Sequence, residues 1–460
     1  MKEQQVDLSR ASSIHVVGAG GAGMSAIATV LTAMGHTVTG SDLRRSAVAE
    51  RLTAGGVPVA IGHAAGNVGD VDVVTVSSAV SESNPEVEEA RRRGIPVLSR
   101  AEILAAIAGR RRCIAVAGTH GKTTTSSMLA LILVEAGLDP SFLIGGDVNE
   151  IGTNAVWGDG SWLVVEADES DGTFLTLPTE IAAVTNVEPD HLDHFGSFDE
   201  LRRAFTTFMD RARFRRIAGG DDPVAAELAA ATSAETVGTG PGCTFRITEL
   251  SAGRSSVSFR LTGPGGRPDG RIELPIPGVH NAANAAVATV AAMAAGAPFD
   301  AAVNALGRFA GAARRFEFRG EANGVTFVDD YAHLPTEVRA TLAAARTGGW
   351  QRIVAVFQPH RYSRVAALWE EFGSAFDDAD VIVVTDIYGA GEAPIPGVSG
   401  RLVADAARLA RPDVPVHYAE RRSDVRREVA SLLAPGDLCV TLGAGDLTSL
   451  PDELRAEPAW

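Results

Sequence analysis

The stretch from Cys113 to Leu131 constrains the fold most, because it predicts a strand, a glycine loop and a helix in succession. The apolar run around Ile114 and Val116 is typical of a buried parallel strand. Gly118-Thr119-His120-Gly121 predicts a tight loop, and Lys122-Thr123-Thr124 then begins a helix. Backbone N–H groups at such a helix start point at a phosphate, and the helix dipole favours its negative charge. This stretch therefore predicts an α/β domain that binds a nucleotide.

The general phosphate-loop pattern G-x-x-x-x-G-K-[ST] assigns roles to two of these side chains. Lys122 would reach the β- and γ-phosphates of ATP, and the Thr123 hydroxyl would hold Mg²⁺. The match is incomplete, because the first glycine of the pattern falls on Val116. The alternative is an ordinary strand-to-helix turn that carries a surface lysine.

A second glycine loop lies near the N-terminus. The strand Ile14–Val17 leads into G-x-G-x-x-G at residues 18–23, and Asp42 follows about 20 positions on. This βαβ pattern alone indicates NAD, so an NAD-dependent dehydrogenase is one alternative function. The same turn can hold any pyrophosphate, however, and the second loop at Gly118 would be unexplained in a simple dehydrogenase.

Acidic residues follow two later apolar runs. The run from Trp162 ends in Glu166, where a Mg²⁺ ligand is expected downstream of a phosphate loop. The alternative is that the acids from Glu166 to Asp171 form a solvated loop. The run from Ile181 leads to His191, whose acidic neighbours suit a metal or phosphate edge.

The C-terminal third repeats the strand, loop and helix rhythm of a Rossmann-like domain. Two of its expected strands end in groups of polar residues, which are Asp330, Tyr331 and His333 after the first, and His360, Arg361 and Arg364 after the second. Parallel strands place such groups at one edge of the sheet. The alternative is a set of surface basic residues.

Composition narrows the function classes. The 460 residues suit about three domains, and a hydrophobic fraction of 45% allows packed cores. A net charge of −16 argues against a general binder of nucleic acid or anionic membrane. The three distant cysteines suggest no disulfide framework, and the N-terminal residues lack an apolar signal core, so we expect a cytoplasmic protein.

Nine short strings, in this order, carry a resemblance to a known family: GAGGAGM, GTHGKTTT, EADESDGTF, TNVEPDHLDH, GVHNAAN, ARRFE, DDYAH, FQPHRYSR and GAGD. The chain resembles the Mur ligases, the amide-forming enzymes of bacterial cell-wall precursor synthesis. The resemblance implies three α/β domains, with a Rossmann-like domain at 1–108, a P-loop ATPase-like domain at 109–310 and a second Rossmann-like domain at 311–460.

The resemblance also implies ligands for these strings. The UDP of a sugar nucleotide would lie at Gly20, Gly21, Ala22, Gly23, Asp42 and His63. ATP would contact Gly118, Thr119, His120, Gly121, Lys122, Thr123 and Thr124, together with His280, Asn281 and Arg314 or Arg315. Mg²⁺ would be held by Thr123, Glu166 and His191, with Asn186 nearby. The amino acid would meet His360, Arg361 and Arg364, and the catalytic set would be Lys122, Glu166, His191, His333, His360 and Arg361. For Asn281, the plain alternative is a helix N-cap.

Within the family, the strings resemble most the branch that joins L-alanine to UDP-N-acetylmuramate with ATP. A related ligase that recycles a tripeptide onto the same sugar nucleotide is the nearest alternative. Two departures are visible. Leu334 stands where the family usually has a second histidine, and residues 197–216 contain no lysine, so we expect none of the modified lysine that several Mur ligases carry there.

Overall fold

The computed structural model describes residues 7–77 and 79–456. The chain divides into two compact units. The first contains Met1–Ile247, Leu261–Gly270 and Ala283–Leu306, and the second contains Thr248–Arg260, Arg271–Ala282 and Gly307–Trp460.

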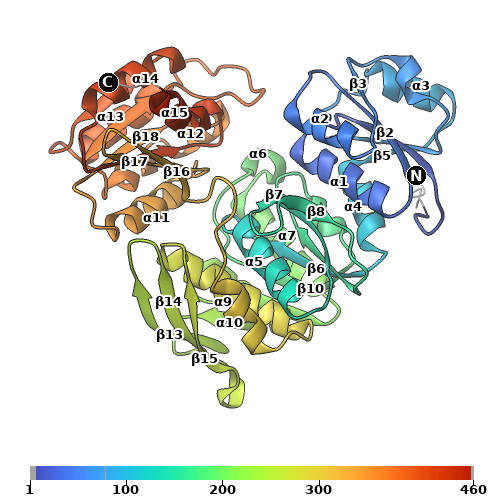
Figure 1. Cartoon of the computed structure of the whole chain (residues 1–460), viewed down its shortest axis with the longest axis horizontal. Helices are drawn as coiled ribbons and strands as arrows, with labels where there is room; N and C mark the ends of the chain where they lie inside the picture. The colour runs from blue at the N-terminus through green and yellow to red at the C-terminus, as the bar shows by residue number, and fades with distance from the viewer. Residues whose placement is uncertain (1–6, 78, 457–460) are drawn as a thin grey trace. The chain divides into compact units, whose positions relative to one another are not determined.

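The N-terminal part of the first unit is a five-stranded parallel sheet in the order β3-β2-β1-β4-β5 (Figure 1). Its elements are β1 (Ser13–Val17), α1 (Ala22–Ala33), β2 (Thr37–Asp42), α2 (Ala47–Ala54), β3 (Val59–Ile61), η1 (Ala65–Val68), β4 (Val73–Val76), α3 (Pro85–Arg92), β5 (Val97–Ser99) and α4 (Arg100–Ala108). The strand order reverses direction between β1 and β4, which is where open parallel sheets bind ligands. The predicted βαβ unit is confirmed.

The central sheet has the order β15-β14-β13-β12-β11-β10-β6-β9-β7-β8. Its first elements are β6 (Arg112–Ala117), α5 (Lys122–Glu135), β7 (Ser141–Val148), β8 (Thr153–Val156), β9 (Trp162–Glu166), η2 (Thr173–Thr176), β10 (Thr179–Val184), α6 (Leu192–Phe195) and α7 (Phe198–Arg211). They are followed by β11 (Arg215–Gly219), α8 (Pro223–Thr232), β12 (Glu235–Gly238), β13 (Phe245–Ala252), β14 (Val257–Thr262), η3 (Pro264–Gly266), β15 (Asp269–Leu274), α9 (Val279–Ala294) and α10 (Phe299–Leu306). Strand β6 lies between β10 and β9, so the phosphate-loop candidate follows an interior strand.

The C-terminal sheet has the order β16-β17-β21-β18-β19-β20, and it is parallel except at β16. Its elements are β16 (Glu317–Ala322), β17 (Val325–Asp330), α11 (Pro335–Arg346), β18 (Arg352–Phe357), α12 (Tyr362–Leu368), η4 (Glu371–Phe376), β19 (Val381–Thr385), α13 (Gly400–Ala410), β20 (Val416–Ala419), α14 (Arg422–Leu432), β21 (Asp437–Leu442), η5 (Asp446–Ser449) and α15 (Leu450–Arg455). Both predicted polar groups follow strands of this sheet.

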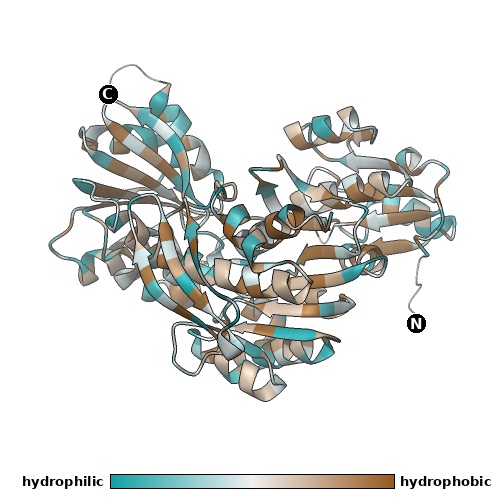
Figure 2. Ribbon diagram, turned by 60° about the horizontal axis from the view of Figure 1, so that its bottom comes forward, coloured by the Kyte–Doolittle hydropathy of each residue, from teal (hydrophilic) through white to brown (hydrophobic). Residues whose placement is uncertain are grey.

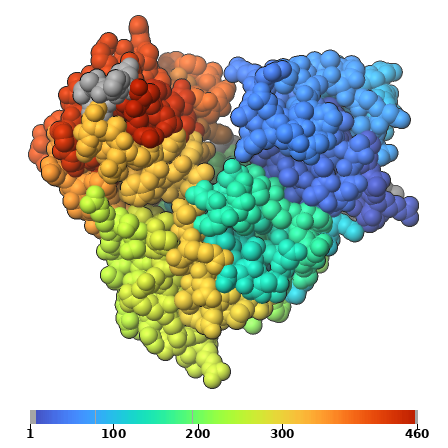
Figure 3. All heavy atoms as spheres, viewed as in Figure 1, coloured from blue at the N-terminus to red at the C-terminus, as the bar shows by residue number. Residues whose placement is uncertain are grey.

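Apolar strands build the cores. Ile114 to Ala117 in β6 and Ile353 to Phe357 in β18 are fully buried, because helices cover both faces of a parallel sheet. Figure 2 shows hydrophobic residues concentrated in the sheet strands. Within the first unit, α1 packs against β7 and β8. In Figure 3 the blue surface of the first 110 residues adjoins the teal surface of the segment that follows in this unit. No helix in the described ranges has the length and apolar character needed to cross a membrane.

Candidate active site

The loop between β6 and α5 is packed so closely that two of its positions require glycine. Gly118 has a φ of +131°, and a Cβ there would lie 2.1 Å from Thr185 Oγ1. Gly121 has a φ of +80°, and its Cβ would lie 2.4 Å from Asn284 Oδ1. Both backbone conformations are in the region that favours glycine. Asn284, the last residue of the GVHNAAN string, is a further residue that the structure places against the loop.

Lys122 opens α5 and turns back over the loop. Its Nζ donates to Gly118 O at 2.7 Å, to Thr119 O at 3.4 Å and to Glu169 Oε1 at 2.7 Å. Burial alone would lower the pKa of Lys122, but Glu169 and Asp168 raise it above its usual value, so the side chain is an ammonium at neutral pH. Lysine occurs in the sequence only at positions 2 and 122.

Glu169 is a site residue that the sequence analysis considered only as part of a solvated acidic loop. Only 2% of the residue is exposed, and its Oε2 is buried without a hydrogen-bond partner in the described part of the chain. Its other oxygen holds the Lys122 ammonium. The acidic loop is therefore not uniformly solvated.

Thr123 and Glu166 lie together, as the sequence predicted. The Thr123 hydroxyl donates to Glu166 Oε1 at 3.0 Å, and the backbone N–H of Gly145 donates to Glu166 Oε2 at 2.7 Å. A hydroxyl and a carboxylate side by side are the oxygen ligands that Mg²⁺ prefers, so these residues fit that ion.

His191 lies in a different set of contacts. Its Nε2 is 3.2 Å from Asp190 Oδ2, and it precedes α6 with a φ of +53°. Within residues 7–77 and 79–456, no three or more His, Cys, Asp and Glu side chains form a group that could hold a metal. The proposed metal role of His191 thus stays a prediction.

The end of β10 holds the glycine loop from the other side. The His120 N–H donates to Asn186 Oδ1 at 2.8 Å, and Asn186 Nδ2 donates to His120 O at 3.1 Å. The His120 ring lies 3.1 Å from Glu188 Oε2. Asn186 therefore fixes the backbone of the loop.

In the first glycine loop, the Asp42 carboxylate holds the backbone in place. The Gly20 N–H donates to Asp42 Oδ2 at 2.8 Å, and the Arg44 N–H donates to Oδ1 at 3.1 Å. Residues 21–23 are exposed. His63 follows β3, at the same edge of the sheet, with its Nδ1 3.1 Å from Ser41 Oγ. The predicted residues of the UDP site thus gather at the carboxyl ends of β1, β2 and β3.

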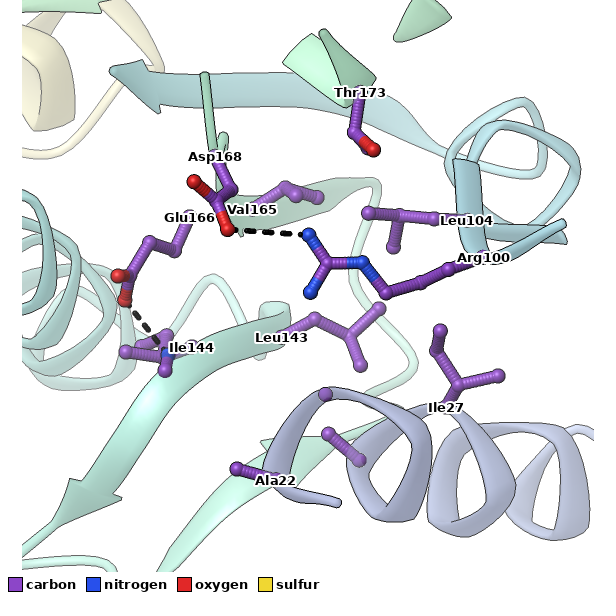
Figure 4. Close-up of a pocket in the computed structure, with 13 residues that line it drawn as sticks. Ala22, Ile27, Arg100, Leu104, Leu143, Ile144, Val165, Glu166, Asp168 and Thr173 are labelled. Carbon is purple, nitrogen blue, oxygen red and sulfur yellow. Dashed lines mark hydrogen bonds and ion pairs between the residues drawn. The ribbon is translucent and has the colours of Figure 1, made fainter. Parts of the chain in front are cut away.

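A cavity of about 190 Å³ connects the first loop with the carboxylate after β9. Ala22 and Ile27 lie on one side of it, and Glu166 and Asp168 on another (Figure 4), while Gly23 and Gly145 also line it. The sequence reasoning did not propose any cationic residue here, yet Arg100 extends across the cavity (Figure 4).

Arg100 makes ion pairs on the central side. Its Nη2 lies 3.2 Å from Asp168 Oδ2 and 3.5 Å from Asp171 Oδ2, while a Cβ on Gly23 would lie 3.1 Å from its Nη1. Burial would raise the pKa of Asp168, but Lys122, the Ser170 N–H and Arg100 together lower it to about 2. The only sequence signal for Arg100 is its position directly after β5, at the ligand edge of the sheet.

In the second unit, the two neighbouring arginines differ. Arg314 is held by Asp329 Oδ2 at 3.1 Å and by Gly443 O at 2.6 Å. The Arg315 guanidinium has no hydrogen-bond or ion-pair partner among the described residues and lies 5.1 Å from the centre of the Tyr331 ring. Arg315 is therefore the arginine whose donors remain available for a phosphate.

Asp330 and His280 are both affected by Arg315. Burial raises the pKa of Asp330 to about 6, although Arg315 and the N–H groups of Phe316 and Ala332 oppose the shift. Burial and the charge of Arg315 lower the pKa of His280 to about 4, so this ring is neutral at pH 7. Asn281 lies inside α9 and donates to Pro277 O at 2.7 Å, so the N-cap alternative is wrong.

The predicted amino-acid site is gathered at the ends of β17 and β18. The His360 ring stacks on Tyr388 at 5.9 Å and lies 5.6 Å from the His333 ring. Arg364 Nη1 is 3.1 Å from His360 Nδ1, and Arg361 precedes α12 with a φ of +66°. Leu334, the departure from the family pattern, is 3% exposed and serves the core.

Comparison with known families accounts for this architecture. Models of the Mur ligase family match residues 13–112 (catalytic domain), 116–292 (middle domain) and 314–445 (glutamate ligase domain). The chain therefore belongs to the Mur ligase family. The expected three-domain α/β fold is confirmed, and the NAD-dependent dehydrogenase alternative is removed.

Several relatives are similar along their whole length. A UDP-N-acetylmuramate–L-alanine ligase of Anaeromyxobacter sp. (strain Fw109-5) is 46% identical, over 97% of this chain and 98% of the relative. The ligase of the same name from Bradyrhizobium sp. (strain ORS 278) is also 46% identical, over 96% and 98%.

Solved structures agree in fold. The UDP-N-acetylmuramate–alanine ligase of Thermotoga maritima has a TM-score of 0.82 at 28% identity, covering 96% of this chain and 98% of that one. A murein peptide ligase of Psychrobacter arcticus 273-4 has a TM-score of 0.71 at 25% identity, with the same coverage.

Proposed function

We propose that this chain is an ATP-dependent ligase that joins L-alanine to the lactyl carboxylate of UDP-N-acetylmuramate. The observation that carries the proposal is the cavity lined by Gly23 and Glu166. Because Glu166 also accepts a hydrogen bond from Thr123, the cavity supports a diphosphate at the first glycine loop and ATP at the second. The full-length relatives named for this reaction supply the substrates. The reaction belongs to cytoplasmic cell-wall precursor synthesis, and we expect the enzyme to bind neither nucleic acid nor a membrane.

The chemistry requires two steps, because a carboxylate is a poor electrophile. A carboxylate oxygen attacks the γ-phosphorus of ATP, ADP leaves, and an acyl phosphate forms. The amine of L-alanine then attacks the acyl carbon, the tetrahedral intermediate expels phosphate, and the nitrogen loses a proton. The amide bond that forms replaces the acyl–oxygen bond that breaks.

Residues of the phosphate loop serve the first step. Lys122 would exchange its loop carbonyls and Glu169 for phosphate oxygens and stabilise the charge of the transferring group. Thr123 and Glu166 would hold Mg²⁺, which neutralises phosphate charge when bound. His191 would serve a second ion. Arg315, or Arg314 as its alternative, would add a positive charge near the phosphates.

The remaining predicted residues bind substrates. His280 and Asn281 would contact the adenine side of ATP, and Gly20 to Gly23, Asp42 and His63 would hold the UDP group. His333, His360, Arg361 and Arg364 would receive L-alanine, with an arginine fork on its carboxylate. The domain limits 1–108, 109–310 and 311–460 remain part of this proposal.

A phosphate-release assay tests the proposal. With ATP and UDP-N-acetylmuramate saturating, L-alanine should be turned over efficiently, glycine and L-serine poorly, and the tripeptide not at all. Arg361→Ala should raise the KM for L-alanine by roughly ten- to a hundredfold, because a charge-assisted bond is worth about 1.5–3 kcal/mol, while the KM for ATP changes little. Efficient use of the tripeptide with L-alanine inert would instead make the chain a recycling ligase.

A further inference from the structure

The carboxylate of Glu86 is a buried hydrogen-bonding centre beside the predicted UDP site. The side chain is fully buried, with an exposed fraction of 0%. Its partners are Ser41 Oγ at 2.5 Å, Asn67 Nδ2 at 2.6 Å, the Ala64 N–H at 3.1 Å, His15 Nε2 at 3.4 Å and His63 Nδ1 at 3.5 Å. These partners come from β1, β2, the loop after β3 and η1, so the carboxylate connects four segments near the ligand-binding edge of the sheet.

The surroundings of this carboxylate keep it ionised. Glu86 is the second residue of α3, after the N-cap Asn84 and Pro85, where the helix dipole favours a negative charge. Burial alone would raise its pKa, but the hydrogen bonds from His15, Ser41 and Asn67 lower the pKa to about 2. Glu86 is therefore a fixed acceptor at neutral pH.

The hydrogen bond that Glu86 accepts from Ser41 determines which nitrogen of His63 carries the proton. The Ser41 hydroxyl gives its one proton to Glu86 Oε2, so Ser41 Oγ can only accept from His63. His63 Nδ1, at 3.1 Å, must then be the donor. In the neutral ring Nε2 is left with a lone pair, and no described residue is its partner. His63 is 11% exposed in its side chain, so Nε2 is the ring atom that remains for a ligand.

We propose that Glu86 is a positioning residue that acts through Ser41 to hold His63 with Nε2 as a hydrogen-bond acceptor for the nucleoside of the sugar nucleotide. The ligand group that meets Nε2 is a donor, which means a ribose hydroxyl or the uracil N–H and not a diphosphate oxygen. This inference rests on the proposed function, because that function supplies the uridine nucleotide. It adds two residues, Glu86 and Ser41, to the nucleotide site, and it states that His63 Nε2 accepts the hydrogen bond that the nucleoside donates.

His15 provides a matched control for a purely structural role. It contacts the same carboxylate, at 3.4 Å, but from the middle of β1, where its other nitrogen meets Thr39 Oγ1 at 2.8 Å. Its exposed fraction is 1%, so it cannot touch a ligand. A change at His15 should weaken the fold without altering His63.

The experiment is calorimetry of UDP binding to the full chain, with melting temperatures for each variant. Glu86→Gln, Ser41→Ala and His63→Ala should each weaken UDP by about three- to tenfold, the range of one hydrogen bond. Adding Glu86→Gln or Ser41→Ala to His63→Ala should weaken UDP no further. His15→Gln should lower the melting temperature and leave UDP affinity unchanged. If Glu86→Gln fails to fold, Ser41→Ala carries the same test.

Nucleotide analogues test whether the nucleoside is the hydrogen-bond donor to His63 Nε2. UDP lacking the 2′-hydroxyl, lacking the 3′-hydroxyl or methylated at uracil N3 each loses one donor. One of the three should bind the unaltered chain about three- to tenfold more weakly than UDP, and that penalty should vanish in His63→Ala. If every analogue binds His63→Ala with the same loss of affinity that it shows with the unaltered chain, the proposal is overturned. It is also overturned if Glu86→Gln lowers UDP affinity as much in the His63→Ala background as in the unaltered chain.

Turnover separates this inference from the proposed function. Glu86→Gln should raise the KM for UDP-N-acetylmuramate and leave kcat and the KM for ATP nearly unchanged. A chain that binds UDP with the predicted coupling but releases no phosphate with L-alanine would refute the ligase assignment alone. A working ligase with additive Glu86 and His63 effects would refute the positioning role alone.

Discussion

The two glycine loops of the first unit follow the same pattern of strand, turn and helix, yet their chemistry differs. The loop before α1 presents exposed glycines, and the first turn of α1 contains neither acid nor base. The loop before α5 is followed at once by Lys122 and Thr123. Lys122 is hydrogen-bonded to Glu169 in the loop after β9, and Thr123 to Glu166 at the end of β9.

This difference indicates how each loop handles phosphate. The first offers a diphosphate its backbone N–H groups and a helix dipole but no charged side chain of its own, which suits a group that binds and does not react. The second adds a mobile charge and a metal-binding pair, which suit a phosphoryl group whose charge changes during reaction. Four predictions test this contrast, from the largest expected effect to the smallest.

Lys122→Ala should abolish turnover, with a loss of about a thousandfold or more, because no other described residue carries an ammonium near the phosphates. Binding of UDP-N-acetylmuramate, measured by calorimetry, should survive because it uses the other loop. If Lys122→Ala lost affinity for the sugar nucleotide and kept ATP binding, the loop before α1 and not the loop before α5 would be the one that binds ATP.

Glu166→Gln should raise the Mg²⁺ requirement or cut kcat by about a hundredfold, since an amide is a poorer ligand than a carboxylate. The melting temperature should change little, because the amide oxygen can accept from the Gly145 N–H while the amide NH2 donates to the Thr123 hydroxyl oxygen. The measurement is phosphate release against Mg²⁺ concentration. A large drop in melting temperature at normal Mg²⁺ dependence would indicate a structural role.

The glycines themselves should respond unequally. Gly118→Ala should cost stability and ATP turnover, because its Cβ would meet Thr185 Oγ1 at 2.1 Å and its φ of +131° is strained for alanine. Gly20→Ala, whose Cβ would meet only the end of the Asp42 side chain at 2.7 Å, should mainly raise the KM for the sugar nucleotide. The measurements are the melting temperature and the steady-state kinetics of both variants. Equal losses of stability and ATP turnover in the two variants would contradict the difference between the two loops.

Near the first loop, the buried carboxylate of Glu86 should make the fold sensitive to acid. Its pKa is lowered in the folded chain from 4.5 to about 2, so its contribution to stability is present above about pH 4.5 and is lost as pH falls toward 2. The contribution is at most about 3 kcal/mol. The melting temperature of Glu86→Gln should therefore approach that of the unaltered chain as pH falls from 4.5. A constant gap would show that Glu86 is not ionised in the fold.

The sequence predicted the strands and the residues at their ends well, because buried parallel strands are apolar runs and their carboxyl ends share one edge. It could not predict which side chain meets which. Arg100 contacts Asp168, which lies 68 positions away in the sequence, and that contact depends on how α4, which begins at Arg100, packs against η2. Arg314 and Arg315 look equivalent as a pair, and only the fold shows which one Asp329 holds.

Glu86 illustrates the other limit of sequence reasoning. Its helix, PEVEEARR, has the composition of a solvent-exposed surface helix, so its glutamates are expected in water. The donors that bury Glu86 come from residues 15, 41, 64 and 67. Such a cluster has no local signature, because its members are separated in sequence and brought together only by the sheet.

The scarcity of lysine has a consequence for the fate of a reactive acyl phosphate. Such a compound acylates any free amine, but Lys122 is the one amine-bearing side chain in the described part of the chain, and three acceptors keep it protonated. Arginine, which supplies the other positive charges, stays protonated and is a poor nucleophile. The described side chains therefore offer the activated sugar no competing amine, and the amino acid is the nucleophile that remains.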